Sequence, residues 1–273
     1  MRFLETLLKL MDLPMKTPSL FGWFHWLCLG LTVLSTVLLC RGHKQDSPQR
    51  VRSVVLTTSV IVIILEVYKQ INYSFSYGSG IDFDYQWYAF PFQFCSTPMY
   101  VGLAAGLVKK GWLRDVLYDY LATFSVFAGL CVMLYPGDVF CDTLGINIQT
   151  MICHGSMVVI GIYLIYTGEA KLQHKTVLKA AGVFACAVTL AVVLNEMAYF
   201  SGILKTETFN MFFISRHCAP SLPVYSSVQA VVPYPWSLLI YVAVFTLAAD
   251  LVLLSAMGIQ KIAHHKEKVP VLH

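Results

Sequence analysis

A cysteine and a histidine in separate apolar runs are the residues of this sequence best suited to chemistry. Cys95 lies about nine residues into one run and His154 about seven to nine residues into another. At ~1.5 Å per helical residue, both lie roughly 10–14 Å below the same surface. A thiolate attacks carbonyl carbon, and a nearby imidazole moves the proton. If the two helices are neighbours, Cys95 would therefore be a nucleophile and His154 its base. Asn147 and Thr150 share one polar helix stripe with His154, which should face the interior.

Three further polar residues are expected in the same half of the membrane. They are Glu66, Asn195 and Glu196, each a few residues from the end of its apolar run. A charge within a membrane helix costs ~2.5–3.5 kcal/mol on insertion scales, so each needs a reason. Glu66 or Asn195 would orient the imidazole, as a third group does in catalytic triads. The plainer alternatives are packing for the thiol, an interhelical hydrogen bond for the imidazole, and a pair with Lys69 or Gln70 for Glu66.

Two prolines interrupt the apolar run that carries Cys95. Pro91 and Pro98 each lack a backbone N–H, and Pro98 frees the carbonyl of Phe94. A broken helix is tolerated at membrane depth only where the loose backbone is buried or wet. The stretch 90–98 is therefore the best local candidate for a site.

Long membrane helices must position these residues. The chain has 273 residues, 57% of them hydrophobic and 12% charged, whereas soluble domains carry roughly 25% charged residues. A helix needs about 20 apolar residues to cross the hydrocarbon core. About seven such runs are present, which predicts an all-α, polytopic membrane bundle that forms a single domain over residues 1–273. The expected helices span residues 20–40, 53–71, 86–108, 116–135, 147–166, 177–199 and 236–257.

The charges of the loops predict the direction of the bundle. Cytoplasmic loops carry an excess of Lys and Arg. The first, third and fifth loops and the C-terminal tail are rich in them, whereas the second and fourth loops are short and acidic. This pattern predicts that the N-terminus lies outside and the C-terminus in the cytoplasm. The cations that carry the prediction are Arg41, Lys44, Arg50, Arg52, Lys109, Lys110, Arg114, Lys171, Lys175, Lys179, Lys261, Lys266 and Lys268.

Two of the eight cysteines lie in loops that are expected outside, where disulfides persist. They are Cys141 in the fourth loop and Cys218 in the long sixth loop, about residues 201–235. A disulfide between them and two free thiols both fit the sequence. The sixth loop is rich in aromatic residues and proline, so we expect it to lie on or dip into the outer interface. We predict no metal site and no cofactor.

Several short segments, each present once, follow one another in a characteristic order along the chain. They are residues 21–25 (FGWFH), 90–95 (FPFQFC), 135–138 (YPGD), 153–155 (CHG), 194–195 (LN), 209–213 (FNMFF) and 232–236 (VPYPW). Their order and spacing resemble the YwaF-type family of integral membrane proteins and the related eukaryotic transmembrane protein 164 acyltransferases. The resemblance implies a seven-helix fold, an acyl group carried on Cys95, His154 as its base, a phospholipid acyl donor and a lipid acceptor. Gln93 departs from the family, which often has histidine at that position.

Two functions fit these observations. The first is an intramembrane lipid acyltransferase or acyl hydrolase that works through an acyl-thioester on Cys95, with membrane lipid as substrate. The alternative is a non-catalytic carrier, or a receptor for a lipid or small ligand, in which Glu66, Asp119, Glu196 and Asp250 line a path. A retinal protein is disfavoured because the last run lacks a Schiff-base lysine. We expect no nucleic-acid partner, and the plasma membrane as the location if the chain is bacterial.

Overall fold

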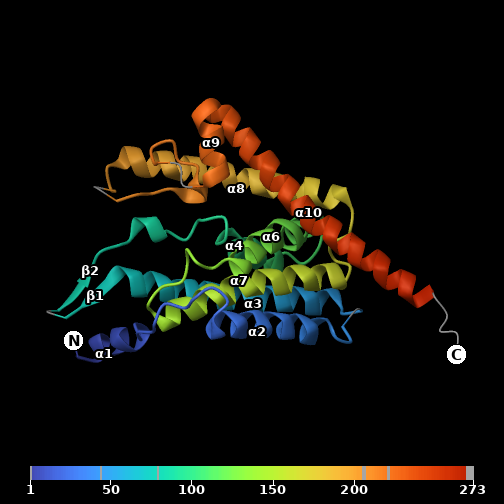
Figure 1. The fold of residues 1–273 in the computed structure, drawn as a ribbon, viewed down its shortest axis with the longest axis horizontal. Helices are drawn as coiled ribbons and strands as arrows, with labels where there is room; N and C mark the ends of the chain where they lie inside the picture. Colours follow the sequence, from blue (N-terminus) through green and yellow to red (C-terminus); the bar gives the residue numbers. More distant parts are fainter. Residues whose placement is uncertain (1, 44, 79, 205–206, 220–221, 269–273) are drawn as a thin grey trace.

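The computed structural model describes residues 2–43, 45–78, 80–204, 207–219 and 222–268 (Figure 1). Six helices of this described part are long and apolar enough to cross a membrane. The predicted all-α, multi-pass membrane protein is therefore confirmed. The helices are α1 (Arg2–Met11), α2 (Trp23–Cys40), α3 (Pro48–Ser74), α4 (Thr97–Leu107), α5 (Trp112–Tyr120), α6 (Val126–Leu134), α7 (Leu144–Tyr166), α8 (His174–Ser201), α9 (Pro223–Val231) and α10 (Tyr234–Lys268). The short elements are β1 (Phe75–Tyr77), β2 (Ile81–Phe83), η1 (Trp87–Ala89), η2 (Leu121–Ser125) and η3 (Met211–Phe213).

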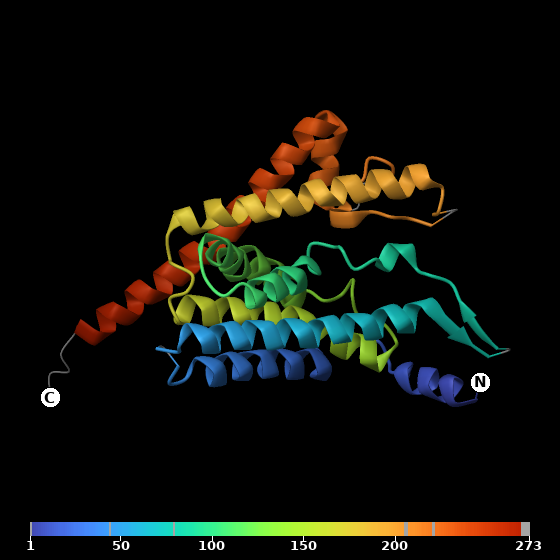
Figure 2. The ribbon, with the colours of Figure 1, turned by 180° about the vertical axis from the view of Figure 1, so that it is seen from behind.

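The helices are arranged in three layers. Helices α2, α3 and α7 form one outer layer, and α8 and α10 form the other (Figures 1 and 2). Helices α4, α5 and α6 lie between them, and α5 continues through the π-helical turn η2 into α6. This central helix, Trp112–Leu134, is mostly buried inside the protein. It therefore contacts both outer layers, and α7, which packs beside it, carries the polar stripe that was predicted to face the interior.

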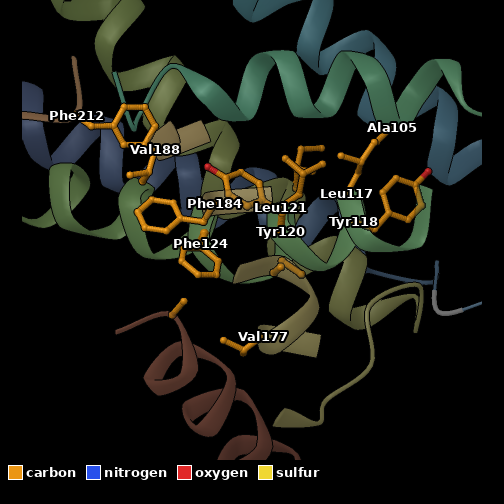
Figure 3. Packing of buried hydrophobic residues seen from close by; sticks show 14 of the residues in the cluster. Ala105, Leu117, Tyr118, Tyr120, Leu121, Phe124, Val177, Phe184, Val188 and Phe212 are labelled. Atoms are coloured by element: carbon orange, nitrogen blue, oxygen red, sulfur yellow. The ribbon is translucent and has the colours of Figure 1, made fainter. Parts of the chain in front are cut away.

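Stacked aromatic rings join the central layer to α8 and to the loop that follows it (Figure 3). The ring of Phe184 in α8 stacks on Phe124 of η2 with 4.7 Å between centroids, and its centroid lies 6.0 Å from that of Phe212. Aromatic pairs contribute about 0.5–1.5 kcal/mol each beyond the area they bury. Because Phe212 is fully buried, the sixth loop is part of the core at this point and does more than lie on the interface.

The segment that was expected as a third helix, residues 86–108, is helical only in its second half. Helix α4 has 11 residues and rises about 16 Å, roughly half of the ~30 Å hydrocarbon core. Pro98 fits the first turn of α4, where no N–H is needed. Pro91 disfavours helical geometry at Phe90, whose ψ is 132°. The bundle thus contains a half-helical segment in place of one expected helix.

This half-helical segment follows α3 in the opposite direction. Near one end, Gln70 Nε2 donates a hydrogen bond of 2.8 Å to the carbonyl of Ala89. Near the other end, α4 packs on α3 through Gly102 and Gly106, a GxxxG pair of the kind that lets membrane helices approach closely. A Cβ at Gly106 would lie 2.6 Å from Leu56 Cβ. The glycines therefore fix α4 against α3 and, with it, the position of the chain just before α4.

The cation-rich loops lie together at one end of the bundle. The Tyr163 hydroxyl at the end of α7 donates to Asp46 at 2.6 Å, and Arg114 donates to Glu169 at 3.4 Å. The hydrogen bond from Tyr163, together with nearby Arg50, lowers the pKa of Asp46. At the opposite end, α1, the β1–β2 hairpin and the fourth loop meet. This agrees with the predicted alternation; the direction across the membrane stays a prediction. Lys44 and the side chains of Lys266 and Lys268 lie outside the described residues.

Candidate functional site

A cavity of about 700 Å³ lies between α3, the chain before α4, α6, α7 and the loop after α8. This volume is typical of ligand pockets, which span roughly 300–1,000 Å³. Cys95, His154 and Glu66 all line the cavity. The structure thus brings together three side chains that the sequence had placed in the same half of the membrane, with Cys95 and His154 at matching depth.

Cys95 lies two residues before α4 begins. The next residues are held firmly, because Thr97 Oγ1 is 2.7 Å from the Tyr120 hydroxyl and donates to the carbonyl of Phe94 at 2.9 Å. The N-terminus of a helix carries roughly half a positive charge. The break in the segment places Cys95 just before this N-terminus, and the residue lines the cavity.

His154 offers one free nitrogen to the cavity. Its Nδ1 lies 2.7 Å from the carbonyl oxygen of Thr150. Because a carbonyl can only accept, Nδ1 carries the proton and the Nε2 of the neutral ring has a lone pair. Nε2 is buried and has no hydrogen-bond partner within the described residues. The imidazole is therefore oriented by the backbone and available as a base, although it is not hydrogen-bonded to Cys95 in this state.

Glu66 is engaged by neighbours on α3 and α7. Its carboxylate accepts hydrogen bonds from Gln70 at 2.8 Å and Gln149 at 3.2 Å, and lies 2.7 Å from Lys69 Nζ. The plainer expectation, a pair with Lys69 or Gln70, is thus confirmed. The carboxylate reaches α7 through Gln149 rather than through His154. Glu66 therefore adds a buried charged pair to the cavity wall and does not orient the imidazole.

Asn195 and Glu196 lie outside this cavity. Asn195 donates to the carbonyl of Met211 at 3.1 Å and accepts from its N–H at 2.8 Å. Glu196 accepts hydrogen bonds from Arg216 at 2.7 Å and His217 at 3.1 Å. The structure gives Asn195 a contact that holds the loop after α8, in place of the predicted contact with the imidazole.

Gln93 has a role that sequence reasoning missed. Its side chain donates to the carbonyl of Asn210 at 3.0 Å and accepts from the N–H of Phe212 at 2.8 Å. Phe212 and Phe213 both have φ of 58°, a left-handed conformation that is strained for aromatic residues. Phe213 lines the cavity. Gln93 therefore holds the strained loop at Phe212 and Phe213, which forms part of the cavity wall. The sequence feature that could have indicated this role is the position of Gln93 between two prolines.

The two loop cysteines are free thiols in the structure. Cys141 Sγ lies 3.8 Å from the carbonyl of Thr143, and Cys218 Sγ lies 3.5 Å from that of Phe209. Both line the same cavity as Cys95. The sequence allowed either a disulfide or two thiols, and the structure has two thiols.

The acids of the opposite half are paired away from the cavity. Asp119 lies 3.7 Å from Lys179, and Asp250 lies 2.9 Å from His174 Nδ1. Neither acid is among the described residues that line the cavity. A continuous path of acids through the bundle, which the carrier alternative requires, therefore has no support from these contacts.

Comparison with known proteins identifies the relatives of this chain. The model of the TMEM164 family matches residues 20–253. This range includes Cys95, His154 and the half-helical segment between α3 and α5. The expected relation to the transmembrane protein 164 group is confirmed, while the relation to YwaF-type proteins stays a prediction. No curated protein and no solved structure matches the chain.

Proposed function

Since the chain belongs to the TMEM164 family, we propose that it is an intramembrane enzyme that transfers fatty-acyl groups between lipids through a thioester on Cys95. The observation that carries the proposal is the buried, unpartnered Nε2 of His154 in the cavity that Cys95 also lines. A buried nitrogen without a partner is costly, about 1–3 kcal/mol. A proton-transfer role gives a reason for it.

The first step moves an acyl group to the protein. His154 Nε2 takes the proton of the Cys95 thiol, and the sulfur attacks the ester carbonyl of a phospholipid. The ester C–O bond breaks as the thioester forms, and His154 returns the proton to the departing lysophospholipid oxygen. Catalytic hydrogen bonds are often long before substrate binds, so the missing contact between thiol and imidazole is compatible with this step.

The second step releases the acyl group. The hydroxyl of an acceptor lipid gives its proton to His154 Nε2 and attacks the thioester carbonyl. The C–S bond breaks, and the thiol recovers its proton from the imidazole. Water in place of the acceptor lipid would make the same site an acyl hydrolase, and the two outcomes are distinguished by the product.

The test is acyl labelling of the purified protein in lipid. The substrate is a phospholipid with an alkyne-tagged acyl chain, and the variants are Cys95→Ala and Cys153→Ala. Cys153 lines the same cavity, so its variant is a matched control for loss of a thiol. We expect the wild type and Cys153→Ala to carry label that neutral hydroxylamine removes, as it does from thioesters. Labelling of Cys95→Ala at the wild-type level would overturn the proposal.

A further inference from the structure

An apolar groove of about 730 Å³ runs between α2 and α7. Helix α2 lies on the side of the bundle farthest from α8 and α10 (Figures 1 and 2). Carbon forms nearly all of the groove wall, and no charged side chain of the described residues lines it. Two of the few hydroxyls in the wall, those of Thr32 and Ser156, donate to the backbone of their own helices, at 2.9 and 2.7 Å. The groove therefore offers a chain-like ligand mostly apolar contacts.

A small space, called the passage below, lies between this groove and the cavity that Cys95 lines. The passage is a space of about 30 Å³. It shares Cys95 and Cys153 with the polar cavity, and it shares Thr58, Ser156 and Ile160 with the groove. The passage thus has walls in common with both larger spaces. Cys95 lies between a cavity lined by the charged groups of Glu66 and Lys69 and a groove that no charged side chain of the described residues lines.

We propose that the groove holds the fatty-acyl chain of the lipid whose ester carbonyl reaches Cys95, while the polar cavity holds the rest of that lipid. This assignment rests on the proposed acyl transfer. An ester lipid has its carbonyl between a polar part and an apolar chain. The sulfur of Cys95 likewise lies between a cavity with charged groups in its wall and a groove with none among the described residues.

The passage must widen for a chain to pass. Met99 and Met157 form part of its wall, and unbranched thioether side chains adapt to irregular spaces better than other apolar residues. On the groove side, Leu27 and Leu31 of α2 are about half exposed, at 50% and 51%. These exposed faces let a lipid enter sideways from the membrane. Selection among acyl chains would then come from the fit along the passage, because lipid and groove are equally apolar.

The experiment places a large ring in the wall that the passage and groove share. Ser156→Phe narrows this point, and Thr189→Phe makes the same change from a hydroxyl on the exposed face of α8. Both variants are labelled with phospholipids that carry either a palmitoyl or a butanoyl chain. We expect Ser156→Phe to lower palmitoyl labelling of Cys95 by about tenfold or more, with butanoyl labelling and the Thr189→Phe control unchanged. Equal loss of both labels in folded Ser156→Phe, or no loss of either, would overturn the groove assignment. The proposed function is judged separately, by labelling of Cys95 in the wild type.

A second measurement on the wild type needs no variant to fold. A phospholipid with a photoreactive diazirine at the end of its acyl chain is activated in the membrane, and the crosslinked peptides are identified. We expect crosslinks at the groove residues of α2 and α7, near Leu31 and Ile152. Crosslinks spread equally over the exposed face of α8, near Leu190 and Val193, would overturn the groove. Failure of the proposed function is seen separately, as absence of any label on Cys95.

Discussion

Two buried histidines in different helices differ in one hydrogen bond. His25 in α2 accepts from the N–H of Phe21 at 3.0 Å through Nδ1, and its Nε2 lies 2.7 Å from the carbonyl oxygen of Met133. His154 in α7 makes the bond to Thr150 through Nδ1, and its Nε2 has no partner within the described residues. Their side chains are equally inaccessible, at 0% and 5% exposure.

The difference fits a structural role for His25 and the proposed chemical role for His154. The last four carbonyls of a helix have no partner within it, and Met133 is next to the last residue of α6. His25 therefore caps the central helix, and both of its nitrogens are satisfied. His154 keeps one nitrogen free in a cavity beside a thiol. Burial alone does not distinguish the two histidines. The proposed base is the one with a nitrogen that has no partner within the described residues.

The largest expected effect is on acyl labelling of matched histidine variants. His154→Asn keeps an amide that can donate to Thr150 but removes the base, so labelling of Cys95 should slow by about 10²–10⁴-fold, the usual contribution of a general base. His25→Asn should leave the labelling rate of the folded protein unchanged. The measurement is the rate of label incorporation per folded molecule, with the folded fraction determined by size-exclusion chromatography. Equal slowing in both variants would remove the distinction between the two histidines.

The next largest effect is on stability, and here the His25 variant should lose more than the His154 variant. His25→Asn leaves the carbonyl of Met133 without its partner, so the free energy of unfolding should fall by about 1–3 kcal/mol. His154→Asn should change it less, because the bond to Thr150 can be kept. Unfolding in detergent, followed by tryptophan fluorescence against denaturant, measures both values. A larger loss in His154→Asn would show that its ring is mainly structural.

The sequence predicted the helices well because the membrane imposes a simple demand on them. Apolar runs located α2, α3, α5–α6, α7, α8 and α10, and these helices extend only a few residues past the expected limits, apart from α10, which runs on to Lys268. The half-helical segment has no charged residue over 86–108, so its length and lack of charge did not distinguish it from a full helix. The two prolines marked the break, but its geometry depends on packing against α3 and on Gln93.

For the candidate site, the sequence predicted only the depth of each residue in the membrane. Counting residues gives depth in the membrane, and depth correctly grouped Cys95, His154 and Glu66. Depth says nothing about which way a helix faces or which helices are neighbours. Asn195 has a suitable depth, but it lies on α8, in the other outer layer, and contacts Met211. The strained wall at Phe212 depends on contacts between segments far apart in the chain, which no local pattern shows.

A smaller effect on labelling is expected from loss of the Gln93 hydrogen bonds to this loop. Gln93→Leu removes two hydrogen bonds to the loop at Asn210 and Phe212, each worth about 0.5–1.5 kcal/mol. Labelling should fall by about three- to tenfold, by the same factor at every pH, because Gln93 moves no proton. The measurement is the pH profile of labelling, with His154→Asn as the contrast, since loss of the base should change the shape of the profile. A changed shape in Gln93→Leu would assign Gln93 to proton transfer.

The finest distinction between the two histidines is the tautomer of each neutral ring. A backbone N–H only donates, so His25 Nδ1 must accept from Phe21 and its proton must lie on Nε2. A carbonyl only accepts, so His154 Nδ1 must hold the proton that it donates to Thr150. Nitrogen-15 NMR of histidine-labelled protein at neutral pH should therefore show opposite neutral tautomers, assigned by the loss of one signal in each Asn variant. The same tautomer at both positions would mean that His154 Nε2 carries a proton and cannot accept one from Cys95. This result would remove the base from the proposed mechanism, but it would leave the hydrogen bond from His25 to the end of α6 unaffected.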